Sequence, residues 1–143
     1  ITNSCWIKST SGGHYLSYGE ASAGRQWSQS LESGKLWLRA SANVLSTDAA
    51  TFGDNAWHHV ALVKPASETT AGVLVYVDGA VQMITASGSD VLTPPTSKMV
   101  VGKLFHASAF YPGRVDDVRQ FDRELTLAEI THLASSRGIE GQP

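Results

Sequence analysis

Short segments in which apolar and polar residues alternate recur along the chain, with turn-forming residues between them. Alternation with a period of two is typical of β-strands that bury one face. Residues 56–64 show the pattern most clearly, because β-branched and aromatic residues strengthen it until Pro65 ends the segment. The predicted strands cover residues 3–8, 14–19, 26–32, 35–40, 56–64, 73–77, 80–84, 98–104 and 113–121.

Two connections between these segments have the form of hairpin turns. Ser33-Gly34 and Asp78-Gly79 each separate two predicted strands. Asp-Gly indicates a type I′ turn, since glycine tolerates a positive φ. In contrast, residues 87–97 contain two prolines and are expected to cross between sheets. The residues after position 40 form a polar stretch that ends at Asn55, and no strand is predicted there.

The period of the pattern changes to that of a helix after Leu125. Thr126 is predicted to be the N-cap with Glu129 as its capping-box partner, and Leu125 with Ile130 fits a hydrophobic staple. Gly138 is predicted to lie just after the helix. The apolar stripe contains Leu127, Ile130, Leu133 and Ala134.

Together these elements predict the fold class. Short strands at spacings of roughly 8 to 12 residues, separated by turns, are typical of an antiparallel sandwich. The length of 143 residues suits a single domain, residues 1–143, that buries a sizeable core. The sequence therefore predicts an all-β fold, an antiparallel two-sheet sandwich with one short C-terminal helix.

Net charge, hydropathy and cysteine content argue against several classes of protein. The net charge is −2 and basic residues are scattered, so no basic stripe for a nucleic-acid partner is present. No run of about 18 apolar residues could form a membrane span. Cys5 is the only cysteine, which excludes an intrachain disulfide, and its apolar neighbours indicate a small buried side chain.

Three stretches in order, WHHVALVK at 57–64, VYVDGAV at 75–81 and VGKLF…GRVDDVRQFDRELTLAEI at 101–130, resemble the laminin-G-like or concanavalin A-like lectin/glucanase superfamily. CWIKS at 5–9 is similar to an early strand of the same family. The resemblance implies a jelly roll with one concave sheet. It also implies an extracellular, cell-surface or virion-surface location.

Family members usually carry a further N-terminal strand before the CWIK-like one, and this sequence contains no candidate for it. Either that strand is missing, or another chain or a sheet edge takes its place. An uncovered edge would expose unpaired backbone groups and favour a homo-oligomer.

Two adjacent carboxylates in the last predicted strand need an explanation, because burying them requires a cation or hydrogen bonds. Ca²⁺ takes six to eight oxygen ligands, so Asp116 and Asp117 are candidate ligands of a structural calcium ion. The resemblance implies this role for Asp116 in particular, together with backbone carbonyls. The alternative is an ion pair with Arg114, Arg119 or Arg123.

The histidines and tryptophans of the strands are interpreted as packing residues. His58 and His59 are consecutive on a strand, so they point to opposite faces, and we expect one to be packed and one exposed rather than both to bind one metal ion. Trp6 and Trp57 are expected in the core.

Catalysis is not expected. A glycosidase needs two carboxylates across a cleft, and the ExDxxE strand motif of the superfamily's glucanase branch is absent. The chain also lacks a GxSxG elbow and a phosphate-binding loop.

Sugar rings stack on exposed aromatic side chains, and the loop at 105–112 is rich in them. Phe105, His106, Phe110 and Tyr111 are therefore the candidate ligand-binding residues, unless the loop folds over the end of the sandwich and packs there. The leading hypothesis is a non-catalytic recognition module that binds carbohydrate or a glycosylated surface. The alternative is a structural or assembly domain of an adhesin or virion-type protein.

Overall fold

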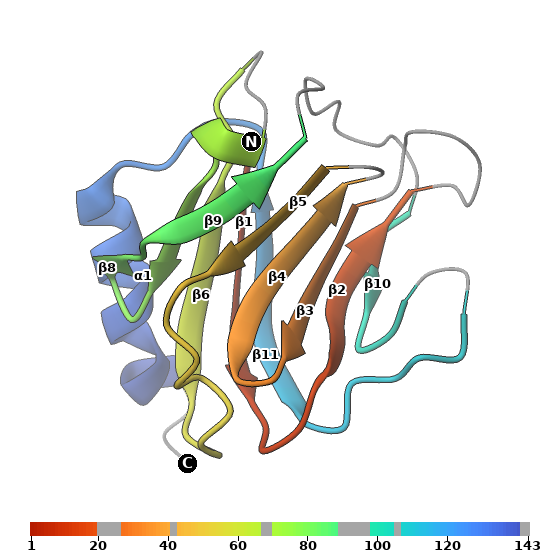
Figure 1. Cartoon of the computed structure of the whole chain (residues 1–143). Helices are drawn as coiled ribbons and strands as arrows, with labels where there is room; N and C mark the ends of the chain where they lie inside the picture. Colours follow the sequence, from red (N-terminus) through yellow and green to blue (C-terminus); the bar gives the residue numbers. More distant parts are fainter. Residues whose placement is uncertain (20–26, 41–42, 67–69, 89–97, 105–106, 141–143) are drawn as a thin grey trace.

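Two antiparallel sheets lie face to face in the computed structural model of the protein (Figure 1). The structure describes residues 1–19, 27–40, 43–66, 70–88, 98–104 and 107–140. In spatial order, the five-stranded sheet contains β11 (Arg114–Phe121), β1 (Thr2–Lys8), β6 (His58–Val63), β7 (Leu74–Val77) and β8 (Ala80–Val81). The six-stranded sheet contains β10 (Val100–Val101), β2 (Gly13–Tyr18), β3 (Trp27–Glu32), β4 (Lys35–Ala40), β5 (Asn43–Thr47) and β9 (Ile84–Ser87). The predicted two-sheet fold is confirmed.

Both predicted hairpins form. Ser33 and Gly34, between β3 and β4, have φ values of 51° and 77°, and Asp78 and Gly79, between β7 and β8, have 52° and 82°. Positive φ at both central positions matches the right-handed twist of the flanking strands. The second hairpin is shorter than predicted, because β8 ends at Val81.

Two strands of the six-stranded sheet were not predicted. β5 and β9 pair with each other, with Leu45 opposite Ala86. In β5, Asn43, Ser46 and Thr47 are buried although they are polar, so the strand shows no apolar alternation. β9 belongs to the opposite sheet from β8, and the chain changes sheets within a stretch that was predicted as one strand. The predicted strand 98–104 is also shorter and forms only β10.

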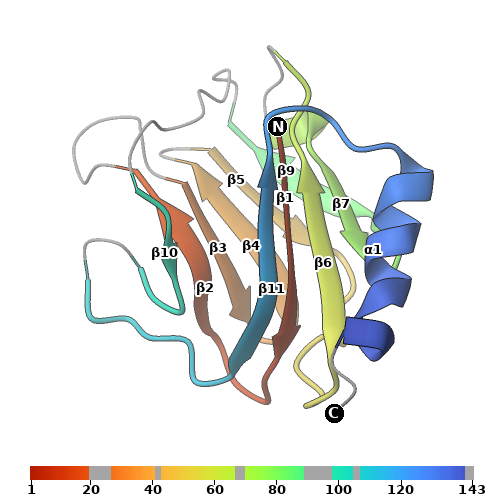
Figure 2. The same cartoon turned by 180° about the vertical axis from the view of Figure 1, so that it is seen from behind.

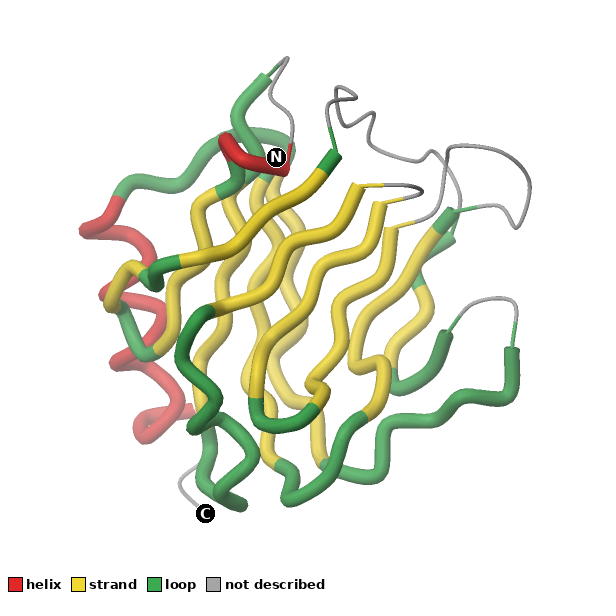
Figure 3. The backbone as a smooth tube through the Cα atoms, in the orientation of Figure 1, coloured by secondary structure: helices red, strands yellow, loops and turns green. Residues whose placement is uncertain are grey.

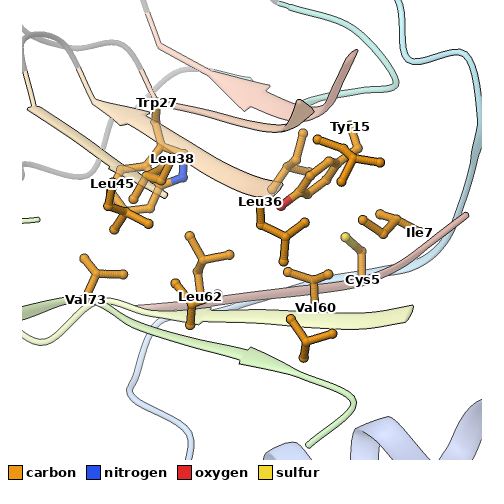
Figure 4. Packing of buried hydrophobic residues seen from close by; sticks show 14 of the residues in the cluster. Cys5, Ile7, Tyr15, Trp27, Leu36, Leu38, Leu45, Val60, Leu62 and Val73 are labelled. Atoms are coloured by element: carbon orange, nitrogen blue, oxygen red, sulfur yellow. The ribbon is translucent and has the colours of Figure 1, made fainter. Parts of the chain in front are cut away.

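The main core lies between the sheets, and Figure 4 shows side chains from both sheets meeting there. Trp27 is 1% exposed and stacks on Tyr18 at a ring distance of 5.8 Å. The Asn3 side chain reaches across from the other sheet and donates a hydrogen bond of 2.7 Å to the Tyr18 hydroxyl. The labelled core residues are Cys5, Ile7, Tyr15, Trp27, Leu36, Leu38, Leu45, Val60, Leu62 and Val73.

A second apolar cluster lies on the outside of the five-stranded sheet, where helix α1 (Leu127–Glu140) packs beside β6 and β7 (Figure 2). A short 3₁₀ helix, Thr70–Gly72, precedes β7. The buried members of the cluster are Ala61, Val63, Tyr76, Leu125, Ile130 and Leu133. The predicted stripe is therefore correct for Ile130 and Leu133, whereas Leu127 is exposed.

The capping box of α1 is present. The Thr126 amide donates to Glu129 Oε2 at 2.8 Å, and the Glu129 amide donates to Thr126 Oγ1 at 3.3 Å. The predicted end of the helix is wrong, because the helix continues through Gly138 to Glu140. Glycine accepts helical dihedral angles as well as positive φ, so its presence alone does not end a helix.

The open edge expected beside the first strand is not found. β1 is hydrogen-bonded on both sides, to β11 and to β6. The edges of this sheet are β11 and β8, and β8 has only two residues. The pairing of β11 with β1 shifts register opposite Ser4 and Trp6, where Asp117 has a φ of 47°. A bulge of this kind bends an edge strand and discourages pairing with another chain.

Candidate functional site

The predicted ligand-binding loop is only partly described, because Phe105 and His106 lie outside the described residues. Phe110 is 65% exposed, and the Lys103 ammonium lies 5.8 Å from its ring centroid. The backbone around it is held by the bridge between Lys103 and Phe110 and by a hydrogen bond of 2.8 Å from the Tyr111 amide to the Gly102 carbonyl. Phe110 is thus accessible to a ligand.

Tyr111 points the other way. It is 7% exposed, belongs to the main core and meets the Tyr15 ring edge-on at 6.0 Å. For this residue the structure shows the packing that was considered as the alternative. Consecutive residues of an extended segment point in opposite directions, so one of this pair is exposed while the other is buried.

Asp116 and Asp117 occupy the bulge of the edge strand β11. Arg119 Nε donates to Asp117 Oδ1 at 2.7 Å, and the Asp117 amide donates to Asp116 Oδ1 at 2.8 Å. Asp117 therefore has the ion pair considered as the alternative to a metal. No group of three or more His, Cys, Asp or Glu side chains suited to a metal ion occurs in the described ranges. Two carboxylates supply only part of the six to eight oxygen ligands of Ca²⁺, and the rest would have to be backbone carbonyls. Calcium stays a prediction.

The two consecutive histidines point to opposite faces of β6, as predicted, but neither is exposed, since the His58 side chain is only 13% exposed. His59 is 2% exposed and meets the Trp6 ring edge-on at 5.3 Å. Burial lowers the pKa of His59 to about 4, so its ring is neutral near pH 7. Trp6 is buried as expected, but Trp57 is only partly buried.

His58 lies between two carboxylates. Its Nδ1 is 2.8 Å from Asp78 Oδ2 and its Nε2 is 3.0 Å from Asp54 Oδ1. Burial acts to lower the pKa of His58, but the hydrogen bonds with both carboxylates outweigh it and raise the pKa above its ordinary value. The protonated ring can donate to both partners at once, and this links the β5–β6 loop to the β7–β8 turn.

The outward face of the six-stranded sheet carries aromatic and charged side chains that contact one another. Trp37 and Arg39 of β4 alternate with Leu36 and Leu38, which point into the core. Ser30 of β3 pairs with Trp37 across the strands. We call this set the outer face, and its members are His14, Ser28, Ser30, Glu32, Trp37, Arg39 and Ser46.

Glu32 and Arg39 form a planar, two-pronged ion pair at the centre of the outer face. Arg39 Nη2 donates to Glu32 Oε2 at 2.9 Å, and Arg39 Nη1 also contacts Glu32 Oε1. Ser30 Oγ adds a 2.7 Å hydrogen bond to Glu32 Oε1. The hydrogen bond from Arg39 holds the pKa of Glu32 below its ordinary value, so the carboxylate is ionised. Both side chains remain about a third exposed, at 32% for Arg39 and 37% for Glu32.

Trp37 stands beside this ion pair. The Arg39 guanidinium carbon lies 5.0 Å from the centroid of the indole ring, a cation–π distance that fixes the orientation of the two side chains. The residues that surround them, Ser28 and Ser30, are small. Both serines are fully buried, so the surface open to a ligand consists of the half-buried indole and the ion pair. These groups can offer an apolar contact and hydrogen bonds.

The alternation of 35–40 is sufficient to place Trp37 and Arg39 on the face opposite the core. The ion pair between Arg39 and Glu32 is not predictable in this way, because Glu32 lies opposite Lys35 and Arg39 lies opposite Ser28.

Residues 1–131 match the laminin G model described as the concanavalin A-like lectin/glucanases superfamily. The chain belongs to the concanavalin A-like lectin/glucanases superfamily. The match covers most of the chain and confirms the resemblance of the four sequence stretches. A search of curated proteins found no match.

Several solved structures share the fold at low sequence identity. A Trypanosoma rangeli sialidase in complex with 2,3-difluorosialic acid superposes on 99% of this chain with a TM-score of 0.71 and 18% identity, although the chain covers only 23% of the sialidase. The native heptameric SAP-like pentraxin from Limulus polyphemus has a TM-score of 0.66 and 19% identity, over 96% of this chain and 70% of the pentraxin.

A third similar structure is domain 4 of AbnA, an extracellular arabinanase from Geobacillus stearothermophilus, in complex with arabinotriose. Its TM-score is 0.62 at 20% identity, over 94% of this chain and 66% of that chain. At sequence identities this low, the superpositions establish the shared fold and nothing more. In the described part of the chain, no helix is both long enough and apolar enough to cross a bilayer.

Proposed function

We propose that the protein is a non-catalytic recognition module that binds carbohydrate through the outer face of its six-stranded sheet. The observation that carries the proposal is the arrangement of Trp37 beside the Arg39–Glu32 ion pair on the two central strands of that sheet. Its natural setting is the outside of a cell or a virion, where glycans are exposed.

The chemistry of this face suits a sugar ring. A pyranose presents C–H groups on one side, which pack on an indole, and hydroxyl groups around its rim, which pair with charged groups. The Arg39 fork and the Glu32 carboxylate are already locked by Ser30 and by each other. Binding therefore loses little side-chain entropy, and this preorganisation raises affinity.

Similar proteins support carbohydrate as the class of ligand. Domain 4 of AbnA was solved with arabinotriose, and it covers nearly the whole of this chain in superposition. The superfamily description itself names lectins and glucanases.

The test is a glycan array probed with the wild-type protein and two variants. Trp37→Ala removes the indole, and we expect at least about a 10-fold loss of affinity for the glycans that the wild type binds, as for an aromatic hot spot. Phe110→Ala is the matched control, an exposed aromatic residue outside the outer face. The proposal fails if Trp37→Ala binds as the wild type does or if only Phe110→Ala loses binding.

An assembly domain is the second candidate function. The observation in its favour is the likeness to a pentraxin that is a heptamer. Sedimentation separates the two functions, since a defined oligomer together with an array that shows no glycan bound would favour assembly. A monomer that binds glycans favours recognition.

A further inference from the structure

Two neighbouring cavities open at one end of the sandwich, away from the outer face. The loops β1–β2, β3–β4 and β5–β6 all lie at this end, at the bottom of Figure 3. The larger cavity, about 630 Å³, lies among these three loops, and the smaller, about 390 Å³, adjoins the start of β11. Thr10 lines both, so the two cavities are direct neighbours.

The walls of the larger cavity are set by close backbone contacts. A Cβ on Gly34 would lie 2.4 Å from the Ala50 carbonyl oxygen, and Gly34 has a φ of 77°. The Phe52 amide also donates to the Gly34 carbonyl at 3.0 Å. Only glycine allows the β3–β4 turn to approach the β5–β6 loop this closely. The cavity is therefore a built feature of the loops.

The lining of the larger cavity combines hydroxyl groups and one carboxylate with apolar surface from Leu31, Ala50 and glycines. Thr10, Ser11, Ser33 and Thr51 supply hydroxyls, and Asp54 is the charged residue among the lining side chains. Such groups exchange hydrogen bonds with the hydroxyls of a neutral sugar.

Asp54 is held in a fixed position. Its Oδ1 accepts 2.8 Å and 3.0 Å hydrogen bonds from the Ala56 amide and His58 Nε2, and these bonds lower the pKa of Asp54. Half of the Asp54 side chain remains exposed, at 51%. Both bonds end on Oδ1, which leaves Oδ2 as an acceptor for hydroxyl groups of a ligand.

The charged side chains that line the smaller cavity are basic, whereas the charged side chain of the larger cavity is Asp54. Lys8 and Arg114 are neighbours across β1 and β11, and both line it together with Asn55. No acidic side chain is part of its lining in the described residues. A Lys and an Arg next to each other attract a carboxylate, which Arg can bind through two hydrogen bonds.

We propose that this end of the sandwich is a second binding site, for an oligosaccharide that carries a carboxylate. A neutral sugar unit occupies the larger cavity and donates hydroxyl hydrogen bonds to Asp54, while the carboxylate of the next unit lies against Lys8 and Arg114. The inference extends the proposed function to a second surface, and mutations separate the two because the sites share no residue.

The test uses calorimetric titration with three acidic probes: trigalacturonate, a hyaluronan tetrasaccharide and 3′-sialyllactose. Each has a neutral partner, the methyl esters of the first two and lactose for the third. We expect at least one acidic probe to bind about 10-fold or more tightly than its partner, since hydrogen bonds to charged groups are the stronger ones. Lys8→Ala with Arg114→Ala should abolish this difference, and Asp54→Asn should weaken the acidic probe and its neutral partner alike.

Trp37→Ala is the matched control, since it removes the outer face and leaves the end site intact. Loss of the acid preference in the Lys8→Ala, Arg114→Ala variant, with the preference retained in Trp37→Ala, supports the inference. The inference is overturned if no acidic probe is preferred by the wild type, or if the preference survives in that variant. Thermal melting of each variant confirms that it folds, and amide shifts at Ser33 and Thr51 on titration give a second, independent reading of the site.

Discussion

His59 makes the stability of this protein depend on pH in a defined window. The ring is buried against Trp6, and its Nδ1 has no hydrogen-bond partner among the described residues. Protonation would place a charge in this site, which is why burial lowers the pKa of His59 to about 4. Replacing it by Gln removes the titrating group and keeps a neutral polar side chain.

The size of the effect follows from the two pKa values of His59. In the unfolded chain the ordinary value is 6.5, and in the folded protein it is about 4. Folding lowers the pKa of this base, so its contribution to stability is present above pH 6.5 and is lost as the pH falls toward 4. Between pH 7 and pH 5, linkage gives a loss of roughly 2 kcal/mol in the free energy of unfolding.

Urea unfolding at several pH values between about 7 and 5 measures this loss. The raised pKa of His58 acts in the opposite direction, because its contribution is complete below pH 6.5 and is lost as the pH rises. The comparison of wild type with His59→Gln cancels that contribution, since both proteins retain His58. We expect the wild type to lose roughly 2 kcal/mol more than the variant. If the free energy of unfolding changed with pH by the same amount in the wild type and in His59→Gln, the reasoning would be refuted.

Three further predictions concern single sites. Gly34→Ala should lower the free energy of unfolding by about 1–3 kcal/mol, measured in urea, because its Cβ would meet the Ala50 carbonyl at a positive φ; an unchanged value would contradict the close contact. Cys5, with a buried thiol whose pKa is about 12, should react with a thiol reagent only after unfolding, and fast labelling of the native protein would count against this. If Asp116 and Asp117 bind calcium, the wild type should melt at a higher temperature with calcium than with a chelator. The double variant Asp116→Asn, Asp117→Asn should melt at the same temperature in both conditions. Equal melting temperatures for the wild type in the two conditions would reject the site.

Local pattern was sufficient for the hairpins and for the general architecture. The alternation of 35–40 separates Leu36 and Leu38 from Trp37 and Arg39. The register of the hairpin places Glu32 opposite Lys35, on the same face as Arg39, and the two long side chains then meet. These residues lie close together in the sequence, on either side of one turn. The type of the turn sets which residues of the two strands face each other, so their placement on one face is predictable. The helix start at Thr126 is predictable for the same reason, since a capping box spans only a few residues.

Relations between distant segments could not be predicted in this way. β5 buries Asn43, Ser46 and Thr47, so the strand is stabilised by its neighbours β4 and β9 rather than by an apolar pattern of its own. The link from His58 to Asp78 joins residues 20 positions apart. These contacts exist only once the sheets have formed.

In the predicted ligand-binding loop, two adjacent residues have opposite environments. Phe110 and Tyr111 are adjacent and both aromatic, yet one is exposed and the other belongs to the core. Composition alone could not distinguish them. The packing partner Tyr15 lies almost a hundred residues earlier, and its position is known only from the fold.

The most direct test of carbohydrate recognition by the outer face is a map of amide chemical shifts in the labelled protein during titration with the strongest glycan from the array. We predict that the largest changes fall on Ser28, Ser30, Trp37 and Arg39, on the two central strands, and that they disappear in Trp37→Ala. Changes confined to the loop around Phe110, or no change on β3 and β4 at saturating glycan, would contradict the account.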